Sequence, residues 1–265
     1  MRDLKVGRIN YLNLFPIFNC LEEDKEAPPF NIIDGVPSSL NRLLRDGRIE
    51  ISPSSSIEYL RNREIYEIIE GHSISSFGAI RSILLFSKKT IEELDGEKVL
   101  TSSQSETSVV LLDVILRRFY GYDVELIPSE CNLPDALQQS PACLLIGDDA
   151  LIWRKRLTGS IQPYIYDLGE IWFRNTGLPF VFALWIVRKD ALQEMKEEIS
   201  LFKEALNRAK AKALLSLEHL SSLTPLSTIL SEEEIISYWR QISFDLGEDH
   251  IKGLELFDRF RLTLP

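Results

Sequence analysis

Short β-rich runs alternate with helical patterns as far as about residue 187, and this alternation restricts the fold more than any other feature of the chain. Residues 4–10 have the pattern of a strand. Residues 36–47 have that of a serine-capped helix closed by Gly47, and residues 49–52 that of a second strand. Strands that alternate with helices favour mostly parallel sheets with helices on their faces. The pattern therefore indicates an α/β protein.

The alternation restarts in the middle of the chain. Further strands are expected at 79–87, 98–101, 123–128, within 142–153 and at 180–187. Further helices are expected over 105–121, over 190–220 and after the capping box of Ser231 and Glu234.

Two such α/β units suit 265 residues better than one. If the chain leaves the first unit near residue 87 and returns near 180, residues 1–87 with 188–265 form lobe one and residues 88–187 form lobe two. We therefore predict a two-lobed, periplasmic-binding-protein-like (type II) fold, with a cleft between two mixed, mostly parallel sheets. The ligand is expected in that cleft, at the carboxyl ends of strands.

The charge balance excludes several classes of partner. Thirty basic and 40 acidic residues give a net charge of −10 without a basic block, so neither nucleic acid nor an anionic membrane surface is expected as a partner. No apolar run approaches the roughly 20 residues that a membrane-spanning helix needs. Asp3 and Lys5 interrupt any signal-peptide core, and the three cysteines have no paired spacing. A cytoplasmic protein with reduced thiols is expected.

The chain also lacks the short motifs of common cofactor sites. It has no GxSxG, GxGxxG or GxxxxGK[ST] pattern, so a serine hydrolase, a dinucleotide site and a P-loop have no local support. His72, His219 and His250 are far apart in sequence and form no HxxxH pair. We therefore expect neither a metal ion nor another cofactor.

Three clusters of serine and threonine, at 52–59, 73–82 and 101–108, precede apolar runs. Helix capping and turn formation explain most hydroxyls in such places. The functional interpretation is that helix N-termini and neighbouring hydroxyls bind carboxylates without the help of arginine. Arg81, inside the strand expected over 79–87, has the pattern of an outward, solvated side chain.

Two further segments carry polar groups after a strand. Asn10 and Asn13 follow the first strand, where asparagine commonly shapes a turn. The segment IGDDAL at 146–151 suggests metal ligation or general-base chemistry, but the start of a capped helix explains its aspartates as well.

Taken in order, several segments resemble one family, the chorismate dehydratases of the futalosine route to menaquinone. The matching segments are VGRINYLNLFP, VPSSLNRLLRDGRIEISPSSSIEY, ISSFGAIRSILLFS, TSSQSETSVVLL, LLIGDDALIW and YDLGEIWFRNTGLPFVFALW. They span about residues 6–187, whereas the C-terminal residues match only as a helical pattern.

The resemblance implies a carbon-oxygen lyase that removes water from chorismate, without a cofactor, to give 3-[(1-carboxyvinyl)oxy]benzoate. It places Asn13 and Ser82 at the reactive end of the cleft, with both residues in lobe one. A second set of residues is expected to bind the substrate and comprises Ser56, Ser76, Gly78, Ser105, Thr107, Ser108, Gly147 and Asp148. The expected partner is the small-molecule substrate chorismate, with a homodimer as a further expectation.

The proton acceptor and the function itself have alternatives. No matched position offers a histidine, lysine or glutamate base, so the enolpyruvyl carboxylate of the substrate is expected to take the proton, with Asp148 as the alternative base. One other function is 1,4-dihydroxy-6-naphthoate synthase of the same pathway, whose family carries a histidine motif where this chain has IGDDAL. The other is a non-catalytic protein of the same fold that binds a small anion.

Overall fold

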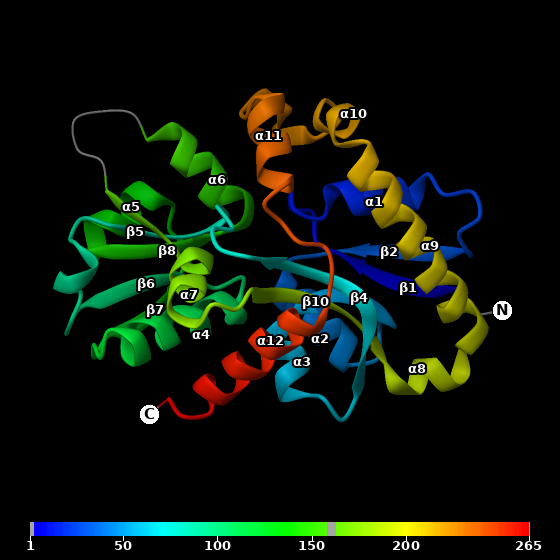
Figure 1. The fold of residues 1–265 in the computed structure, drawn as a ribbon, viewed down its shortest axis with the longest axis horizontal. Coiled ribbons are helices and arrows are strands. Elements are labelled where there is room, and N and C mark those ends of the chain that lie inside the picture. Colours follow the sequence, from blue (N-terminus) through cyan, green and yellow to red (C-terminus); the bar gives the residue numbers. More distant parts are fainter. Residues whose placement is uncertain (1–2, 158–162, 265) are drawn as a thin grey trace. The chain divides into compact units, whose positions relative to one another are not determined.

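The computed structural model describes residues 3–157 and 163–264, which divide into two compact units. Unit 1 consists of the residues up to Ile74 together with Ala183–Leu246. Unit 2 consists of Ser75–Phe182 together with the residues from Gly247 onward. Each unit contains one five-stranded sheet (Figure 1). The predicted α/β class is thereby confirmed.

The sheet of unit 1 has the strand order β2-β1-β3-β10-β4. Its strands are β1 (Leu4–Arg8), β2 (Phe30–Asp34), β3 (Ile51–Ser55), β4 (Tyr66–Ser76) and β10 (Phe180–Arg188). β1 is parallel to β2 and β3, whereas β10 is antiparallel to β3, so the sheet is mixed. The helices of this unit are α1 (Phe15–Glu22), α2 (Pro37–Arg45), α3 (Ser56–Arg61), α8 (Lys189–Glu194), α9 (Lys196–Leu215), α10 (Leu217–Ser221), the 3₁₀ helix η3 (Pro225–Thr228) and α11 (Glu232–Trp239).

Helices cover both faces of this sheet, which explains why its central strands are apolar on both sides. Figure 1 shows α1 and α9 side by side on one face and α2 and α3 on the other. All five residues of β3 are buried as a result, including its serines. The capping box predicted at Ser231 is present at the start of α11, where the Ser231 hydroxyl accepts from the Glu234 N–H.

The sheet of unit 2 has the strand order β7-β6-β8-β5-β9. Its strands are β5 (Ile83–Ser87), β6 (Lys98–Ser102), β7 (Glu125–Ser129), β8 (Ala142–Ile146) and β9 (Tyr164–Asp167). β6 is parallel to β7 and β8, whereas β5 is antiparallel to β8 and β9. The helices of this unit are the 3₁₀ helix η1 (Ile91–Glu93), α4 (Glu106–Asp113), the π-helix η2 (Val114–Phe119), α5 (Leu133–Gln139), α6 (Gly147–Arg156), α7 (Leu168–Thr176) and α12 (Glu248–Arg261).

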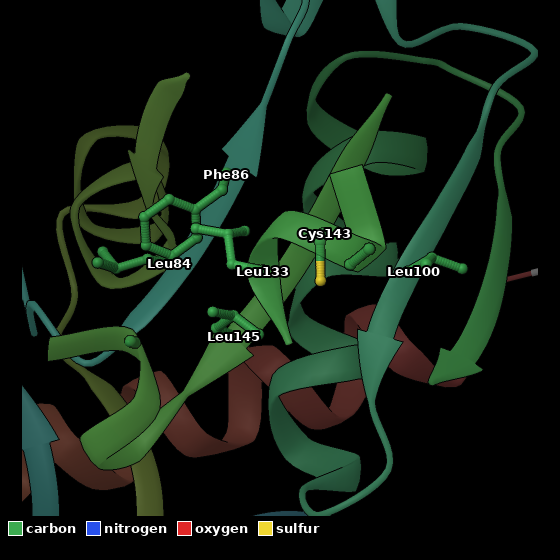
Figure 2. Packing of buried hydrophobic residues seen from close by; sticks show 8 residues of the cluster. Leu84, Phe86, Leu100, Leu133, Cys143 and Leu145 are labelled. Atoms are coloured by element: carbon green, nitrogen blue, oxygen red, sulfur yellow. The ribbon is translucent and has the colours of Figure 1, made fainter. Parts of the chain in front are cut away.

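One face of the second sheet packs on α5 and α6. Leu84 and Phe86 of β5 point to this face together, because side chains two residues apart in a strand share a side. They meet Cys143 and Leu145 of β8 and Leu133 of α5 in one buried apolar cluster (Figure 2).

An aromatic cluster around Trp172 of α7 brings the C-terminal helix into unit 2. The Trp172 ring is fully buried and lies edge-on to Phe180, Phe257 and Phe260, with centroid distances of 5.1, 6.0 and 5.9 Å. Phe257 and Phe260 belong to α12, and Phe260 also lies edge-on to Phe119 of η2 at 5.9 Å. The burial of these rings ties α12 to α7 and η2.

The predicted lobe boundaries, with 1–87 and 188–265 in lobe one and 88–187 in lobe two, are wrong at two places. β5 pairs with β8 and β9, so the chain enters unit 2 within β4 rather than near residue 87. The residues from 247 onward also belong to unit 2. A strand or helix pattern shows that a segment is buried, but it does not show which sheet the segment joins. The chain therefore passes between the units three times, after Ile74, after Phe182 and after Leu246.

The close approach of α12 to the turn before β10 gives a first prediction. A Cβ at Gly253 would lie 2.1 Å from the Pro179 carbonyl oxygen, a backbone atom that cannot rotate away. We expect Gly253→Ala to lower the free energy of unfolding by roughly 1–3 kcal/mol. In an unobstructed helix the same change stabilises by about 0.5–1 kcal/mol, so the sign of the effect is diagnostic. Thermal unfolding measures it.

Glu255→Ala is the matched control, because it places alanine on an exposed position of the same helix. Its unfolding midpoint should stay close to that of the unmodified protein. A Gly253→Ala protein that is as stable as this control would contradict the contact between α12 and Pro179.

Candidate functional site

The parallel strands of unit 1 end together at one edge of their sheet. β1, β2 and β3 run in the same direction, and the chain continues from their carboxyl ends into α1, α2 and α3. β10 begins at this edge, because antiparallel pairing sets Ala183 opposite Ser55. Asn13, in the loop before α1, and Ser56, the first residue of α3, both belong to it. The carboxyl edge is where open α/β sheets bind ligands.

The loop that carries Asn13 is held in place by its neighbours. The Leu14 N–H donates to the Tyr11 carbonyl at 3.0 Å, and Nε1 of Trp239 donates to the Leu12 carbonyl at 2.7 Å. The side-chain oxygen Oδ1 of Asn13 is buried and has no hydrogen-bond partner. A buried unpaired acceptor costs about 1–3 kcal/mol, so this oxygen is a ready acceptor for a ligand donor.

Asn41 is a polar residue of this region that the sequence analysis does not name. It is 5% exposed, its Nδ2 donates to the Ser55 hydroxyl at 3.1 Å, and its Oδ1 has no partner. Ser56, which follows Ser55 in the chain, is fully buried. The available signal for Asn41 is its place three residues before Leu44, on the face of α2 that the pattern predicts to be buried.

The parallel strands β6, β7 and β8 of unit 2 also end at one edge. β5 begins at this edge, because it is antiparallel to β8. Ser82, just before β5, therefore meets Gly147, the first residue of α6, and the Gly147 N–H donates to the Ser82 carbonyl at 2.7 Å. Asp148 follows in the first turn of α6, and residues 105–108 start α4 after β6. The structure thus brings these predicted residues of unit 2 to one sheet edge.

The two residues predicted for the reactive end lie in different units. Asn13 belongs to unit 1 and Ser82 to unit 2, so the placement of both in lobe one is wrong. The physical reason is the pairing of β5 with β8 and β9, which takes the segment from Ser75 onward into the second sheet. Each of the two residues nevertheless lies at the carboxyl edge of its own sheet.

The helices that start at these edges differ in how their first N–H groups are satisfied. Ser105 caps α4, since its hydroxyl accepts from the Ser108 N–H at 3.4 Å. The N-cap residues of α1, α2 and α6 are Leu14, Val36 and Ile146, whose side chains have no acceptor. These three helix starts lack a cap from the N-cap side chain, but Pro16 and Pro37 each remove one N–H from the first turns of α1 and α2, and the first N–H of α6 donates to the Ser82 carbonyl.

Several predicted substrate-binding hydroxyls also have partners within the protein. The Ser76 hydroxyl donates to the Gly78 carbonyl at 2.7 Å, and the hydroxyl oxygens of Ser105 and Ser108 are 3.2 Å apart. Thr107 is 1% exposed. The structural interpretation of these clusters therefore holds for Ser76, which bonds within a turn, and for Ser105, which caps a helix. A hydroxyl has one hydrogen and two lone pairs, so Ser76 can still accept a hydrogen bond but donates to a carboxylate only if it gives up the bond to Gly78.

Asp167 is a buried carboxylate that the sequence analysis does not name. Its Oδ1 caps α7 by accepting from the Gly169 and Glu170 N–H groups at 3.0 and 3.2 Å. The same carboxylate reaches the loop before β5, where the Ile80 N–H donates to Oδ1 at 3.1 Å and the Arg81 N–H to Oδ2 at 2.6 Å. Burial raises the pKa of this carboxyl, and the four N–H donors oppose that shift. An aspartate directly before a helix is the available signal for the cap.

Arg81 does not lie in a strand, contrary to the prediction over 79–87. β5 begins at Ile83, and Arg81 has a φ of 64°. Residues other than glycine avoid this left-handed region at a cost of about 1–2 kcal/mol. Gly78, in the same loop, has a φ of 111°. Strained backbone of this kind clusters at functional sites.

Two of the three histidines have structural roles. His72 of β4 is buried, and its Nε2 donates to Oδ1 of Asn207 at 2.8 Å. Burial lowers the pKa of His72 to about 4, so the ring is neutral near pH 7. Nδ1 of His250 accepts from the Gly247 N–H at the start of α12.

Metal sites and membrane spans were also sought in the described residues. Within residues 3–157 and 163–264, no three His, Cys, Asp or Glu side chains are grouped to hold a metal ion. No helix of the same part of the chain has the length and apolar character to cross a membrane.

Comparison with known proteins identifies the family. The menaquinone biosynthesis family matches residues 4–261. The chain belongs to this family. The chorismate dehydratase of Thermus thermophilus is 30% identical to it over 202 residues, which cover 72% of this chain and 72% of that protein. The resemblance inferred from the sequence motifs is confirmed.

Solved structures confirm the fold of this family member. A protein of Archaeoglobus fulgidus matches with a TM-score of 0.76 and 17% identity over 97% of this chain and 96% of its own. The periplasmic aliphatic sulphonate binding protein of Escherichia coli matches with a TM-score of 0.68 and 15% identity over 100% and 94%. A Candida albicans protein with the generic periplasmic binding protein fold matches with a TM-score of 0.65 and 11% identity over 100% and 91%. The chain therefore has the predicted periplasmic-binding-protein-like fold.

The cap of α4 gives a prediction on the stability of unit 2. Ser105→Ala removes the acceptor for the Ser108 N–H and should lower the free energy of unfolding by about 1 kcal/mol. Ser105→Asp keeps a capping acceptor, and its negative charge suits a helix N-terminus, so it should unfold close to the unmodified protein. Denaturant-induced unfolding measures both. Ser103→Ala, at an exposed position two residues earlier, is the control, and a Ser105→Ala protein of equal stability would rule out the cap.

Proposed function

We propose that this protein is a chorismate dehydratase, a carbon-oxygen lyase of the futalosine route to menaquinone. The match of residues 4–261 to the menaquinone biosynthesis family carries the proposal. The 30% identity to the chorismate dehydratase of Thermus thermophilus supports chorismate as the substrate. The sulphonate-binding neighbours share the fold at 15% identity, which does not favour a non-catalytic binding protein.

The proposed reaction removes a proton and a hydroxyl from neighbouring ring carbons of chorismate. The carbon that bears the enolpyruvyl ether carries the proton, which is acidic because the adjacent ring double bond conjugates to the ring carboxylate. Loss of this proton and of the neighbouring hydroxide forms one new ring double bond, and the two leaving species together make water. The product, 3-[(1-carboxyvinyl)oxy]benzoate, has an aromatic ring, and aromatisation supplies the driving force.

The substrate has two carboxylates, and a chain with a net charge of −10 must offset their charge locally. Helix starts and hydroxyl groups at the carboxyl edge of each sheet supply N–H and O–H donors for this purpose. The residues proposed to hold the carboxylates are Ser56 in unit 1 and Ser76, Gly78, Ser105, Thr107 and Ser108 in unit 2. Gly147 and Asp148, at the start of α6, are proposed to line the site.

Asn13 and Ser82 act at the reactive end in this proposal. The unpaired Oδ1 of Asn13 is suited to accept from the ring hydroxyl, and the amide group also carries a donor for the departing hydroxide. Ser82 donates or accepts through a rotatable hydroxyl. The backbone beside each residue is fixed, by Trp239 in unit 1 and by Gly147 in unit 2, and preorganised groups of this kind are what stabilise developing charge.

The enolpyruvyl carboxylate of the substrate is the proposed proton acceptor. It is connected to the carbon that loses the proton through the vinyl carbon and the ether oxygen, so the acceptor arrives with the substrate. Asp148 is the alternative base, since it is the acidic residue next to Gly147 at the edge that carries Ser82.

The test of the function is turnover of chorismate by the purified protein after exhaustive chelation. We expect the diene absorbance to fall and a product lighter by one water to form, because the elimination involves no redox step. Activity that requires an added divalent ion would contradict the cofactor-free reaction. Tight binding of chorismate without turnover would instead support the binding-protein alternative.

Substitutions test the two residues of the reactive end. Asn13→Ala and Ser82→Ala should stay folded while turnover falls by roughly 10²-fold or more, the scale for loss of a preorganised hydrogen-bonding group. Steady-state kinetics with chorismate measure the effect, with circular dichroism as the check on folding. Near-normal turnover in both folded variants would remove these residues from the mechanism.

Each substitution has a matched control in its own unit. Asn19 of α1 is, like Asn13, partly buried with an unpaired Oδ1, so Asn19→Ala removes the same kind of group from inside a helix. Ser87 is as buried as Ser82 and lies at the other end of β5, where its hydroxyl donates to the Lys89 carbonyl. Both controls should change stability without a large change in turnover.

A further inference from the structure

Ser82 lies between two fixed points of unit 2. On its C-terminal side, the Ser82 carbonyl accepts a hydrogen bond from the Gly147 N–H at 2.7 Å. Before it, the Arg81 N–H donates to Oδ2 of Asp167 at 2.6 Å, and the Ile80 N–H donates to Oδ1 at 3.1 Å. The direction in which the Ser82 side chain leaves the backbone therefore depends on the conformation held at Arg81.

Arg81 does not prefer the conformation that it has. Its φ of 64° lies in the left-handed region, and its neighbours Ile80 and Ser82 are neither glycine nor proline, so the local sequence does not impose it. The hydrogen bond to Asp167 is formed in this conformation and offsets the strain. Asp167 is only 9% exposed, so water competes little for its oxygens.

The loop before β5 also packs directly on the start of α7. A Cβ at Gly169 would lie 2.6 Å from the Gly78 carbonyl oxygen and 2.9 Å from the Ser76 hydroxyl oxygen. Strand pairing sets Leu84 of β5 opposite Asp167. Asp167 therefore connects the loop and the helix through its carboxylate, and the following strand through its backbone pairing.

We propose that Asp167 is a positioning residue for Ser82, whose carboxylate holds Arg81 in the left-handed conformation and thereby directs the Ser82 hydroxyl at the substrate. The inference rests on the proposed function, in which Ser82 acts on chorismate. Asp167 acts through Ser82 rather than on the substrate, because both of its oxygens already accept backbone N–H groups. A displacement of about 1 Å at a reacting group costs on the order of 10²-fold in rate, so such a role is measurable.

Asp167→Asn separates the two tasks of the carboxylate. The amide oxygen still caps α7, since asparagine is among the best N-cap residues. The amide nitrogen then faces the Arg81 N–H, and two donors form no hydrogen bond. We expect a folded protein whose kcat on chorismate is lower by roughly 10- to 100-fold, with a much smaller change in KM. Asp167→Ser, which keeps a cap but is too short to reach Arg81, should behave alike and serves if the asparagine variant does not fold.

Asn132→Ala is the matched control for a lost cap in the same unit. Oδ1 of Asn132 accepts from the Asp135 N–H at the start of α5, so this variant should be less stable with kcat close to that of the unmodified protein. A folded Asp167→Asn protein with normal kcat, or a kcat loss of equal size in Asn132→Ala, would overturn the positioning role.

A double-mutant cycle shows whether Asp167 acts through Ser82. Ser82→Ala already lacks the hydroxyl, so adding Asp167→Asn should lower kcat by less than about twofold more. Multiplicative effects of the two substitutions would overturn the inference, as would normal turnover by Ser82→Ala alone.

Amide hydrogen exchange, measured without substrate, tests whether the Asp167 carboxylate holds the loop at Arg81. In Asp167→Asn, the amide of residue 81 should exchange faster than in the unmodified protein, while that of residue 80 and those at the start of α7, whose acceptor is Oδ1, keep their protection. Unchanged exchange at residue 81 would overturn the proposal. If the unmodified protein fails to dehydrate chorismate and the exchange difference between the two proteins is still found, the proposed function is overturned. The contact between Asp167 and the loop is then supported on its own.

Discussion

Where a buried strand ends, its backbone leaves the hydrogen-bonded ladder, and the next N–H and C=O groups must find other partners. Both sheets meet this demand at the carboxyl edge, by turning the chain into a helix. In unit 2 the largest share falls on Asp167, which accepts four N–H groups from two chain segments. In unit 1 a residue distant in sequence satisfies one such group, since Trp239 donates to the Leu12 carbonyl. The candidate site residues Asn13 and Ser82 are close in sequence to the groups that these hydrogen bonds hold.

The charge of the expected ligand explains why these edges suit it. A dianion approaching a chain with a net charge of −10 gains nothing from the overall charge, so attraction must come from short-range donors. The starts of α1, α2 and α6 have no N-cap side chain that competes for their N–H groups, but Pro16, Pro37 and the hydrogen bond from Gly147 to Ser82 reduce the number of those groups, so side-chain hydroxyls must contribute. At α6 the acidic first turn, Asp148 and Asp149, works against a second anion. In the proposed function, this acidity suits Asp148 better as the alternative base than as a group that holds a carboxylate.

Most strands and helices were predictable from the sequence, because apolar periodicity is a local property, but the strands β2, β4 and β9 were not anticipated. Ser231 was likewise identifiable as a cap by its spacing to Glu234, whereas the sequence left open which hydroxyl of 101–108 caps α4. The sheet that each strand joins was not predictable from the sequence, and β5 shows the reason. Its apolar sequence would suit a central strand of either sheet, and only its pairing with β8 and β9 shows that it belongs to the sheet of unit 2. The carboxylate of Asp167 binds N–H groups 86 and 87 residues away, so its cap was predictable while its hold on Arg81 was not.

The distant C-terminal helix supports the same loop through α7. Asp167 fixes one end of α7, and Trp172, one and a half turns further on, fixes its middle by packing against Phe180, Phe257 and the ring of Phe260. Aromatic burial of this extent outweighs the unpaired Nε1 of Trp172 and the strained φ of Arg81, each of which costs a few kcal/mol at most. The helix is therefore a rigid support, and a rigid support is what allows a strained loop to persist beside it. The C-terminal helix belongs to the second unit because Phe257 and Phe260 pack against Trp172 of α7, the helix whose first turn is capped by the carboxylate that also binds the loop before β5.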